Sequence, residues 1–187
     1  MNFVCWSGIA LLLLAVAPVG LMALARRFSD GPIGPIPGGE LRFGNLIADA
    51  DVDWSFAADT QLAELQLVEP PGSRTTGVLV YEGQLYVPCD LGFIWRRAPA
   101  PAKWLMALVS LVKRWHEQVL RDGRVVIRIR GDRYERQAVR VNEPQLLEAL
   151  RASVEERAVG LLSSPLREAS PDTDAIWFFR LDPRSST

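Results

Sequence analysis

The 187-residue sequence predicts an α+β protein: a mainly antiparallel sheet or small barrel of about six strands with two helices, preceded by a transmembrane helix. Short strand-like runs are joined by apparent hairpin turns at Glu82-Gly83 and Gly131-Asp132. Runs of hairpins with few helices favour an antiparallel sheet over a doubly wound parallel one. The uncharged run from Phe3 to Ala25 indicates the membrane helix.

The expected strands either alternate apolar and polar residues or are rich in β-branched ones. They are Thr60–Val68, Arg74–Tyr81, Gln84–Val87, Arg124–Arg130, Arg133–Val141 and Ala175–Leu181. One expected helix, Ala102–Leu120, ends before Asp122-Gly123. The other, Pro144–Leu162, has apolar residues at helical spacing.

Residues 1–28 are expected to anchor the chain in a membrane, because about 20 apolar residues suffice for a helix to cross a bilayer. A cleaved signal peptide is the alternative, with Ala23-Leu24-Ala25 as its cleavage site, but Met1-Asn2 supplies no basic side chain. A buried core helix is a third option, disfavoured by the apolar surface all round. Since Arg26 and Arg27 follow the run, we expect a single-pass protein of the cell inner membrane with its soluble domain in the cytoplasm.

Residues 29–52 are expected to be a linker, and residues 53–187 the soluble domain. The segment from Ser29 to Gly39 is dense in proline and glycine, which predicts an extended spacer leading away from the membrane. Pro32 and Pro35 also have the spacing of a proline-rich peptide ligand, although a spacer is the favoured interpretation.

The stretch from Asp90 to Val112 combines many apolar residues with a few cations. One hypothesis places it at the membrane interface, in contact with lipid through Trp95, Arg96, Arg97 and Trp104. The alternatives are a lid over a ligand pocket and an ordinary helix packed on the sheet.

Composition excludes several classes of function. The net charge is −1, so no overall attraction to nucleic acid is expected. The two cysteines, Cys5 and Cys89, have no metal-binding spacing, and no metal site is predicted. The single histidine, His116, lies beside Glu117 and is interpreted as part of a solvated helix face, so a histidine-based hydrolase is disfavoured.

Basic residues also line the predicted hairpin between the fourth and fifth strands. Exposure to solvent and cross-strand pairing with Glu135 are the expected explanation. The residues are Arg128, Arg130, Arg133, Arg136 and Arg140. Only Tyr134 is available there to stack on bases, so a nucleic-acid surface is not predicted.

Several segments together resemble the split β-barrel of the pyridoxamine-phosphate-oxidase-like superfamily, which includes FMN-binding and deazaflavin-dependent nitroreductase-like proteins. They are Arg74–Tyr81, Leu85–Val87, Trp115, Leu120–Val125, Ile127–Ala138 and Val141. In this family an Asn is common where Gln118 stands, and a Pro where Gly123 stands. The Pro/Gly linker followed by Asp53-Trp54-Ser55-Phe56 is similar to an uncharacterised, membrane-anchored bacterial branch.

The resemblance implies a flavin, FMN or deazaflavin, held between two protomers of a homodimer formed through the barrel. It implies that basic and hydroxyl side chains bind the cofactor phosphate and that a tryptophan stacks on its ring. The candidate residues are Arg74, Thr75, Thr76, Lys113, Arg114 and Trp115.

The sequence also departs from the family. The Gly-Lys-Ser stretch of deazaflavin-binding members is missing, and Gly77 to Val80 carries no second basic residue. Two functions are therefore expected as alternatives. One is a membrane-anchored flavin-dependent oxidoreductase, in which the flavin carries the redox chemistry. The other is a non-catalytic binding module at the membrane surface that has lost the cofactor and uses none.

Overall fold

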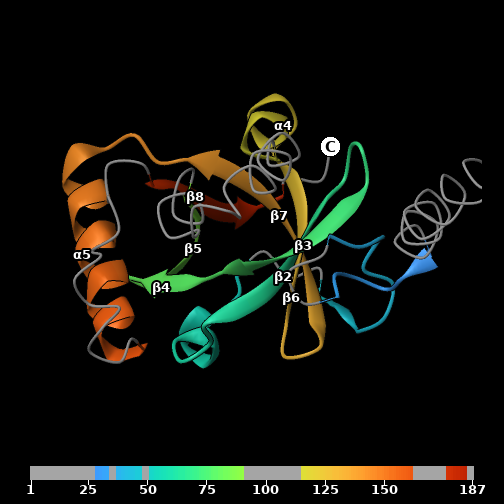
Figure 1. Ribbon diagram of the computed structural model, residues 1–187, viewed down its shortest axis with the longest axis horizontal. Coiled ribbons are helices and arrows are strands. Elements are labelled where there is room, and N and C mark those ends of the chain that lie inside the picture. Colours follow the sequence, from blue (N-terminus) through green and yellow to red (C-terminus); the bar gives the residue numbers. More distant parts are fainter. Residues whose placement is uncertain (1–27, 34–36, 48–50, 91–114, 162–175, 185–187) are drawn as a thin grey trace, which may run out of the picture.

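A computed structural model of the protein describes residues 28–33, 37–47, 51–90, 115–161 and 176–184. Within these ranges the chain is α+β, with one curled, mainly antiparallel sheet and two helices (Figure 1). None of the helices described there is long and apolar enough to cross a membrane. The predicted anchor (1–28, except Phe28), the interfacial residues Trp95 to Trp104, and Lys113 and Arg114 lie outside the described ranges.

The sheet has eight strands, against the six or so expected. Seven follow the order β3-β2-β6-β7-β8-β5-β4, and β1 pairs in parallel with β7. The strands are β1 (Leu46–Ile47), β2 (Leu62–Leu67), β3 (Gly72–Gly77), β4 (Leu79–Tyr81), β5 (Gln84–Asp90), β6 (Arg124–Ile129), β7 (Asp132–Arg140) and β8 (Ile176–Pro183). A short 3-10 helix, η1 (Trp54–Ala57), precedes β2, and the helices α4 (Trp115–Arg121) and α5 (Pro144–Leu161) follow β5 and β7.

The expected strand Arg74–Tyr81 is two strands, and this correction explains why the sheet curls. Among the described strands, β3 pairs only with β2 and β4 only with β5, so they are the two ends of the strand order, and β3 has one further bridge, from Ser73 to Gly38 of the N-terminal segment. A single residue, Val78, separates them, and its N–H donates to Gln61 O at 3.2 Å. Because one continuous segment forms both edges, the edges meet at Val78 and the sheet closes there.

The two hairpin turns differ in how well the sequence predicted them. Glu82 and Gly83 have φ values of 49° and 74°, as the expected two-residue turn requires. The second turn lies one residue earlier than expected, at Arg130-Gly131 (φ 52° and 91°), because Asp132 pairs with Ile129. A left-handed arginine is uncommon, so the residue type at position 130 does not by itself indicate this turn.

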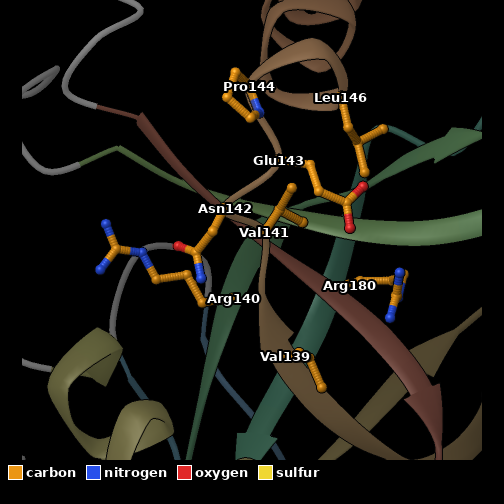
Figure 2. Close-up of a pocket in the computed structure, with 8 residues that line it drawn as sticks. All are labelled: Val139, Arg140, Val141, Asn142, Glu143, Pro144, Leu146 and Arg180. Atoms are coloured by element: carbon orange, nitrogen blue, oxygen red, sulfur yellow. The ribbon is translucent and has the colours of Figure 1, made fainter.

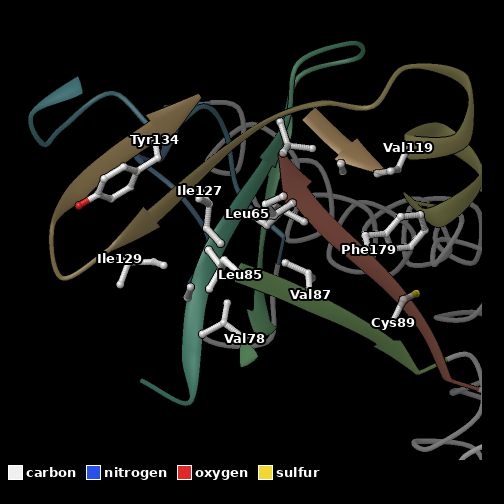
Figure 3. Close-up of a cluster of buried hydrophobic side chains, with 14 of the residues drawn as sticks. Leu65, Val78, Leu85, Val87, Cys89, Val119, Ile127, Ile129, Tyr134 and Phe179 are labelled. Carbon is white, nitrogen blue, oxygen red and sulfur yellow. The ribbon is translucent and has the colours of Figure 1, made fainter. Parts of the chain in front are cut away.

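The larger core cluster fills the inside of the curl. Figure 3 shows Leu65, Leu85 and Ile127 near its middle, and they are 0–1% exposed. Tyr134 lies at one end of this cluster, and Phe179 at the other. Because side chains fill the interior of the curl, a ligand could bind only at the ends of the curl.

A second, smaller cluster lies where α5 packs on the outer face of β8, β5 and β4. Leu150 of α5 and Phe178 of β8 are both 0% exposed in it. Pro144 begins the helix, as a proline with its fixed φ suits a first helical position. The Pro144–Leu162 prediction is therefore confirmed to within one residue at its end.

The segment formed by residues 28–33 and 37–47, here called the N-terminal strap, lies against the sheet. Leu41 is 3% exposed and its N–H donates to Gln66 Oε1 at 2.7 Å. Asp30 forms an ion pair of 2.6 Å with Arg128 of β6, which also pairs with Glu64 of β2. These residues therefore do not form the extended spacer that their proline and glycine content predicted.

The arginines of the β6–β7 hairpin are also placed differently from the prediction. Arg128 pairs with Asp30 and Glu64 and not with Glu135, and Arg133 donates to Leu41 O at 2.8 Å and Gly44 O at 3.1 Å. Arg136 is 2% exposed and its guanidinium lies 5.2 Å from the centre of the Trp54 ring. These arginines have their partners in the strap and in the inner core. Both are distant from the hairpin in the chain, so the hairpin sequence does not predict these contacts.

Replacing Arg128 with Met should lower the free energy of unfolding by about 2–3 kcal/mol, because two partly buried carboxylates lose their cation. Chemical denaturation measures this change. Asp59→Asn is the matched control, since Asp59 pairs with Arg130 at the exposed end of the same hairpin. That variant should lose about 0.5 kcal/mol or less. Equal losses in both variants would contradict the role given to Arg128.

Asp122, between α4 and β6, should stabilise the protein in a pH-dependent way. Hydrogen bonds from the Arg124 side chain lower the pKa of Asp122 from 3.8 to about 2. A lowered pKa in the folded state gives stability that is complete above pH 3.8 and is lost as the pH falls toward 2. The denaturant concentration at the unfolding midpoint should therefore be higher for wild type than for Asp122→Asn at pH 6. This difference should shrink between pH 4 and pH 2. A difference that is constant over this range would contradict the assignment.

Candidate functional site

The candidate site is built around Arg74 on β3 and Trp115, the first residue of α4. Arg74 lies opposite Leu65 in the β2–β3 register, so its side chain shares the inner face of the sheet with that core residue. Its guanidinium carbon is 5.3 Å from the centre of the Trp115 ring, a cation–π contact. Trp115 is 7% exposed and packs on Phe179 of β8, with 5.6 Å between ring centres.

A second arginine–tryptophan pair adjoins the first. Arg140 of β7 lies opposite Phe179 of β8, and its guanidinium carbon is 3.7 Å from the centre of the Trp177 ring. His116 of α4 contacts Trp177 edge-on, with 5.3 Å between ring centres. Arg74, Trp115, His116, Arg140 and Trp177 are called the Arg/Trp cluster below.

Cys89 of β5 borders this cluster. It lies opposite Trp177 in the β5–β8 register and is buried, with 4% of its surface exposed. Figure 3 shows it beside Phe179, at the end of the core that α4 covers. The bend at Val78 brings β3 and β5 together, and an electrostatic interaction links Cys89 to Arg74.

The electrostatics of Arg74 differ from those of Arg128 and Arg180, whose pKa values are raised by hydrogen bonds to carboxylates. Burial lowers the pKa of Arg74 to about 10, and the opposing effect of Cys89 is smaller. It therefore remains a cation at neutral pH. Its Nε is buried and donates to no other described residue, and the ion pairs among the described residues do not include it. A desolvated cation with an unused donor is suited to bind an anionic ligand.

The structure separates the predicted cofactor-binding residues. Thr76 lies opposite Ala63 of the inner core and shares the inner face with Arg74. Thr75 lies opposite Glu64 on the outer face and is exposed. Because neighbouring side chains in a strand point to opposite faces, the side chain of Thr75 points away from those of Arg74 and Thr76.

Sequence reasoning missed three members of the site or misread their surroundings. His116 is half-buried against Trp177, where a solvated helix face was expected. Arg140 is exposed, as predicted, but it stacks on Trp177 and is not paired with Glu135. For Trp177 the sequence predicted only a place in the last strand. Its alternation with Phe179 was a usable signal, but only the β5–β8 pairing places it beside Cys89.

The first of two hollows shares Arg140 with the Arg/Trp cluster, and the second is lined by none of the cluster's members. The first, of about 370 Å³, lies beside the start of α5, and Figure 2 shows Arg140 and Asn142 on one side of it and Arg180 on another. Arg180 is engaged by Asp182, whose hydrogen bond raises the pKa of the arginine. The other hollow, of about 350 Å³, lies beside Trp54 and Arg136.

The side chains of the cluster are better suited to bind a ligand than to transfer protons. Two guanidinium groups can donate to an anion, and two indole rings can contact a flat apolar group. Among the described residues, no group of three or more His, Cys, Asp or Glu side chains is placed to hold a metal ion.

Comparison with known proteins gives similarity in structure only. No protein-family model and no curated protein sequence matches the chain. A solved structure from Listeria innocua, named "Putative Pyridoxamine 5'-phosphate oxidase", is similar with a TM-score of 0.41 and 15% identity, over 67% of this chain and 85% of that one. A conserved hypothetical protein from Mycobacterium tuberculosis is similar with a TM-score of 0.42 and 18% identity, over 75% of this chain and 91% of that one.

Replacing Arg74 with Met should leave the free energy of unfolding within about 1 kcal/mol of wild type, or raise it. The variant loses a cation–π contact but also removes a desolvated charge. Arg128→Met, with two carboxylate partners, is the matched contrast. Chemical denaturation of both variants tests the distinction. A large loss of stability in Arg74→Met would mean that this arginine is structural.

Proposed function

We propose that this protein is a membrane-anchored oxidoreductase that binds a flavin, FMN or deazaflavin, at the Arg/Trp cluster. The observation that carries the proposal is Arg74, a desolvated cation with a buried and unused Nε beside the Trp115 ring. A flavin nucleotide has an anionic phosphate and a flat ring, and the cluster has a partner for each. The resemblance in sequence to the pyridoxamine-phosphate-oxidase-like superfamily supports the same choice.

Within this proposal each residue has a limited role. Arg74 binds the phosphate, with Arg140 as a second cation and Thr76 as a hydroxyl donor on the same inner face. Trp115 or Trp177 contacts the ring. Lys113 and Arg114, directly before Trp115 in the chain, are proposed as further phosphate ligands. When bound, the flavin supplies the two-electron chemistry, and these residues bind and orient it.

The rest of the proposal concerns location and assembly. Residues 1–28 anchor the chain in the cell inner membrane with the soluble domain in the cytoplasm, and the domain forms a homodimer through the barrel. Trp95, Arg96, Arg97 and Trp104 contact lipid. The charge distribution around Phe3 to Ala25 supports the orientation.

The alternative function is a non-catalytic binding module at the membrane surface without a cofactor. The filled interior favours it, since Leu85, Val87 and Phe179 are 0–1% exposed inside the curl. The separation of Thr75 from Arg74 and Thr76 favours it as well. The two functions differ in one measurable property, the affinity for flavin.

Titration of the detergent-solubilised full-length protein into FMN, and separately into a deazaflavin, should change the fluorescence of one of them. Arg74→Met should weaken that binding by about tenfold or more, since a hydrogen bond to a charged group contributes about 1.5–3 kcal/mol. Arg121→Met is the control, because Arg121 is exposed at the end of α4 and should bind flavin as wild type does. If folded wild-type protein changes the fluorescence of neither flavin, the proposed function is wrong and the alternative is favoured.

A further inference from the structure

The N-terminal strap exposes large apolar side chains. Phe28, Ile33 and Phe43 are 68%, 61% and 73% exposed, and Leu46 of β1 is 49% exposed. Soluble proteins often expose single apolar residues, but several on one short segment indicate a contact surface. Figure 1 shows the strap, in blue, at the opposite end of the molecule from α5.

Asp30 holds two parts of the strap together, the start that carries Phe28 and the later part that carries Phe43. Its carboxylate accepts hydrogen bonds from the N–H groups of Arg42 and Phe43, the latter at 3.2 Å. These bonds join the start of the strap, two residues after Phe28, to the backbone that carries Phe43. The hydrogen bonds and the burial of Asp30 act oppositely on its pKa, and the net effect is to lower it, so the carboxylate is charged at neutral pH.

The same residue fixes the strap to the sheet. Arg128 of β6 pairs with Asp30 at 2.6 Å and donates to Phe43 O at 3.2 Å. Gly38 packs so closely on the backbone of Gly31 that a Cβ there would lie 1.7 Å from Gly31 O. The apolar side chains are therefore carried on a folded surface and not on a free tether.

The short distance along the chain between the apolar run and Phe28 indicates that the exposed face of the strap lies near a membrane. The apolar run ends at Ala25, and three residues reach at most about 10 Å. If the run spans a bilayer, Phe28 lies within that distance of its edge. Arg26 and Arg27 directly precede Phe28 and add positive charge, which anionic lipid headgroups attract.

We propose that the exposed face of the N-terminal strap docks on the headgroup region of the bilayer, with Phe28 and Phe43 as its apolar contacts. Aromatic side chains favour this region because they combine contact with lipid and contact with water. The strap then holds the curled sheet in one orientation on the membrane. The inference rests on the membrane attachment proposed above, but not on flavin binding.

The test uses the full-length chain with Cys5→Ser, reconstituted in vesicles of phosphatidylcholine and phosphatidylglycerol. A polarity-sensitive fluorophore is attached to Phe43→Cys in one sample and to Leu120→Cys of α4, which is 51% exposed, in another. Cys89 is 4% exposed, so it should react slowly with the label. The reporter at 43 should shift to the blue on reconstitution and lose quenching by aqueous iodide, whereas the reporter at 120 should remain in water.

Three other outcomes would overturn the inference. If the chain stays on the vesicles while the reporter at 43 remains in water, docking is refuted and attachment is retained. If the chain does not stay on the vesicles, both are refuted. If the shift at 43 disappears when the protein is diluted in excess lipid, a second copy of the chain covers the surface, and not the bilayer.

Discussion

The bend at Val78 joins the two edges of the sheet, and both the shape of the core and the composition of the site depend on it. The two edge strands belong to one continuous segment. The sheet must therefore curl so that its two edges lie next to each other. Arg157 of α5 supports the bend by donating to Val78 O at 3.2 Å. Closure at this point brings β3, which carries Arg74, into contact with β5, which carries Cys89, although the two strands are not neighbours in the sheet.

Three arginines among the described residues lie in different surroundings, which indicate different roles. Arg128 has two carboxylate partners and joins the strap to the sheet. Arg136 is almost fully buried and stacks on Trp54 at one end of the core. Arg74, at the other end, is desolvated without a carboxylate among the described residues, and its buried Nε is unused. Because such an arrangement costs stability, it is a stronger sign of ligand binding than the number of basic residues.

The strap connects the two halves of the proposed function. It leads from the apolar run to β1. β1 pairs with the first part of β7, and the later part of β7 pairs with β8. Because Asp30, Leu41 and the strap backbone are all bonded to the sheet, a membrane anchor at the N-terminus would act directly on the position of the curled sheet. Arg74 and Arg140 of the Arg/Trp cluster belong to the same sheet. The strap would therefore also fix the distance between this cluster and the bilayer.

By itself, the sequence determined the elements whose information is local. Alternation within Arg124 to Ile129, the Glu82-Gly83 turn and the spacing of Leu146, Leu147 and Leu150 each depend on residues close in the chain. Arg74 and Trp115 entered the candidate site through a family resemblance, and their contact confirms that they are neighbours without showing what they bind. Only the tertiary structure decided that Arg74, and not Thr75, faces the core, that Arg140 and Trp177 join the site, and that the strap binds the sheet. These features depend on strand register and on pairing between distant segments, and the sequence pattern around each residue carries neither.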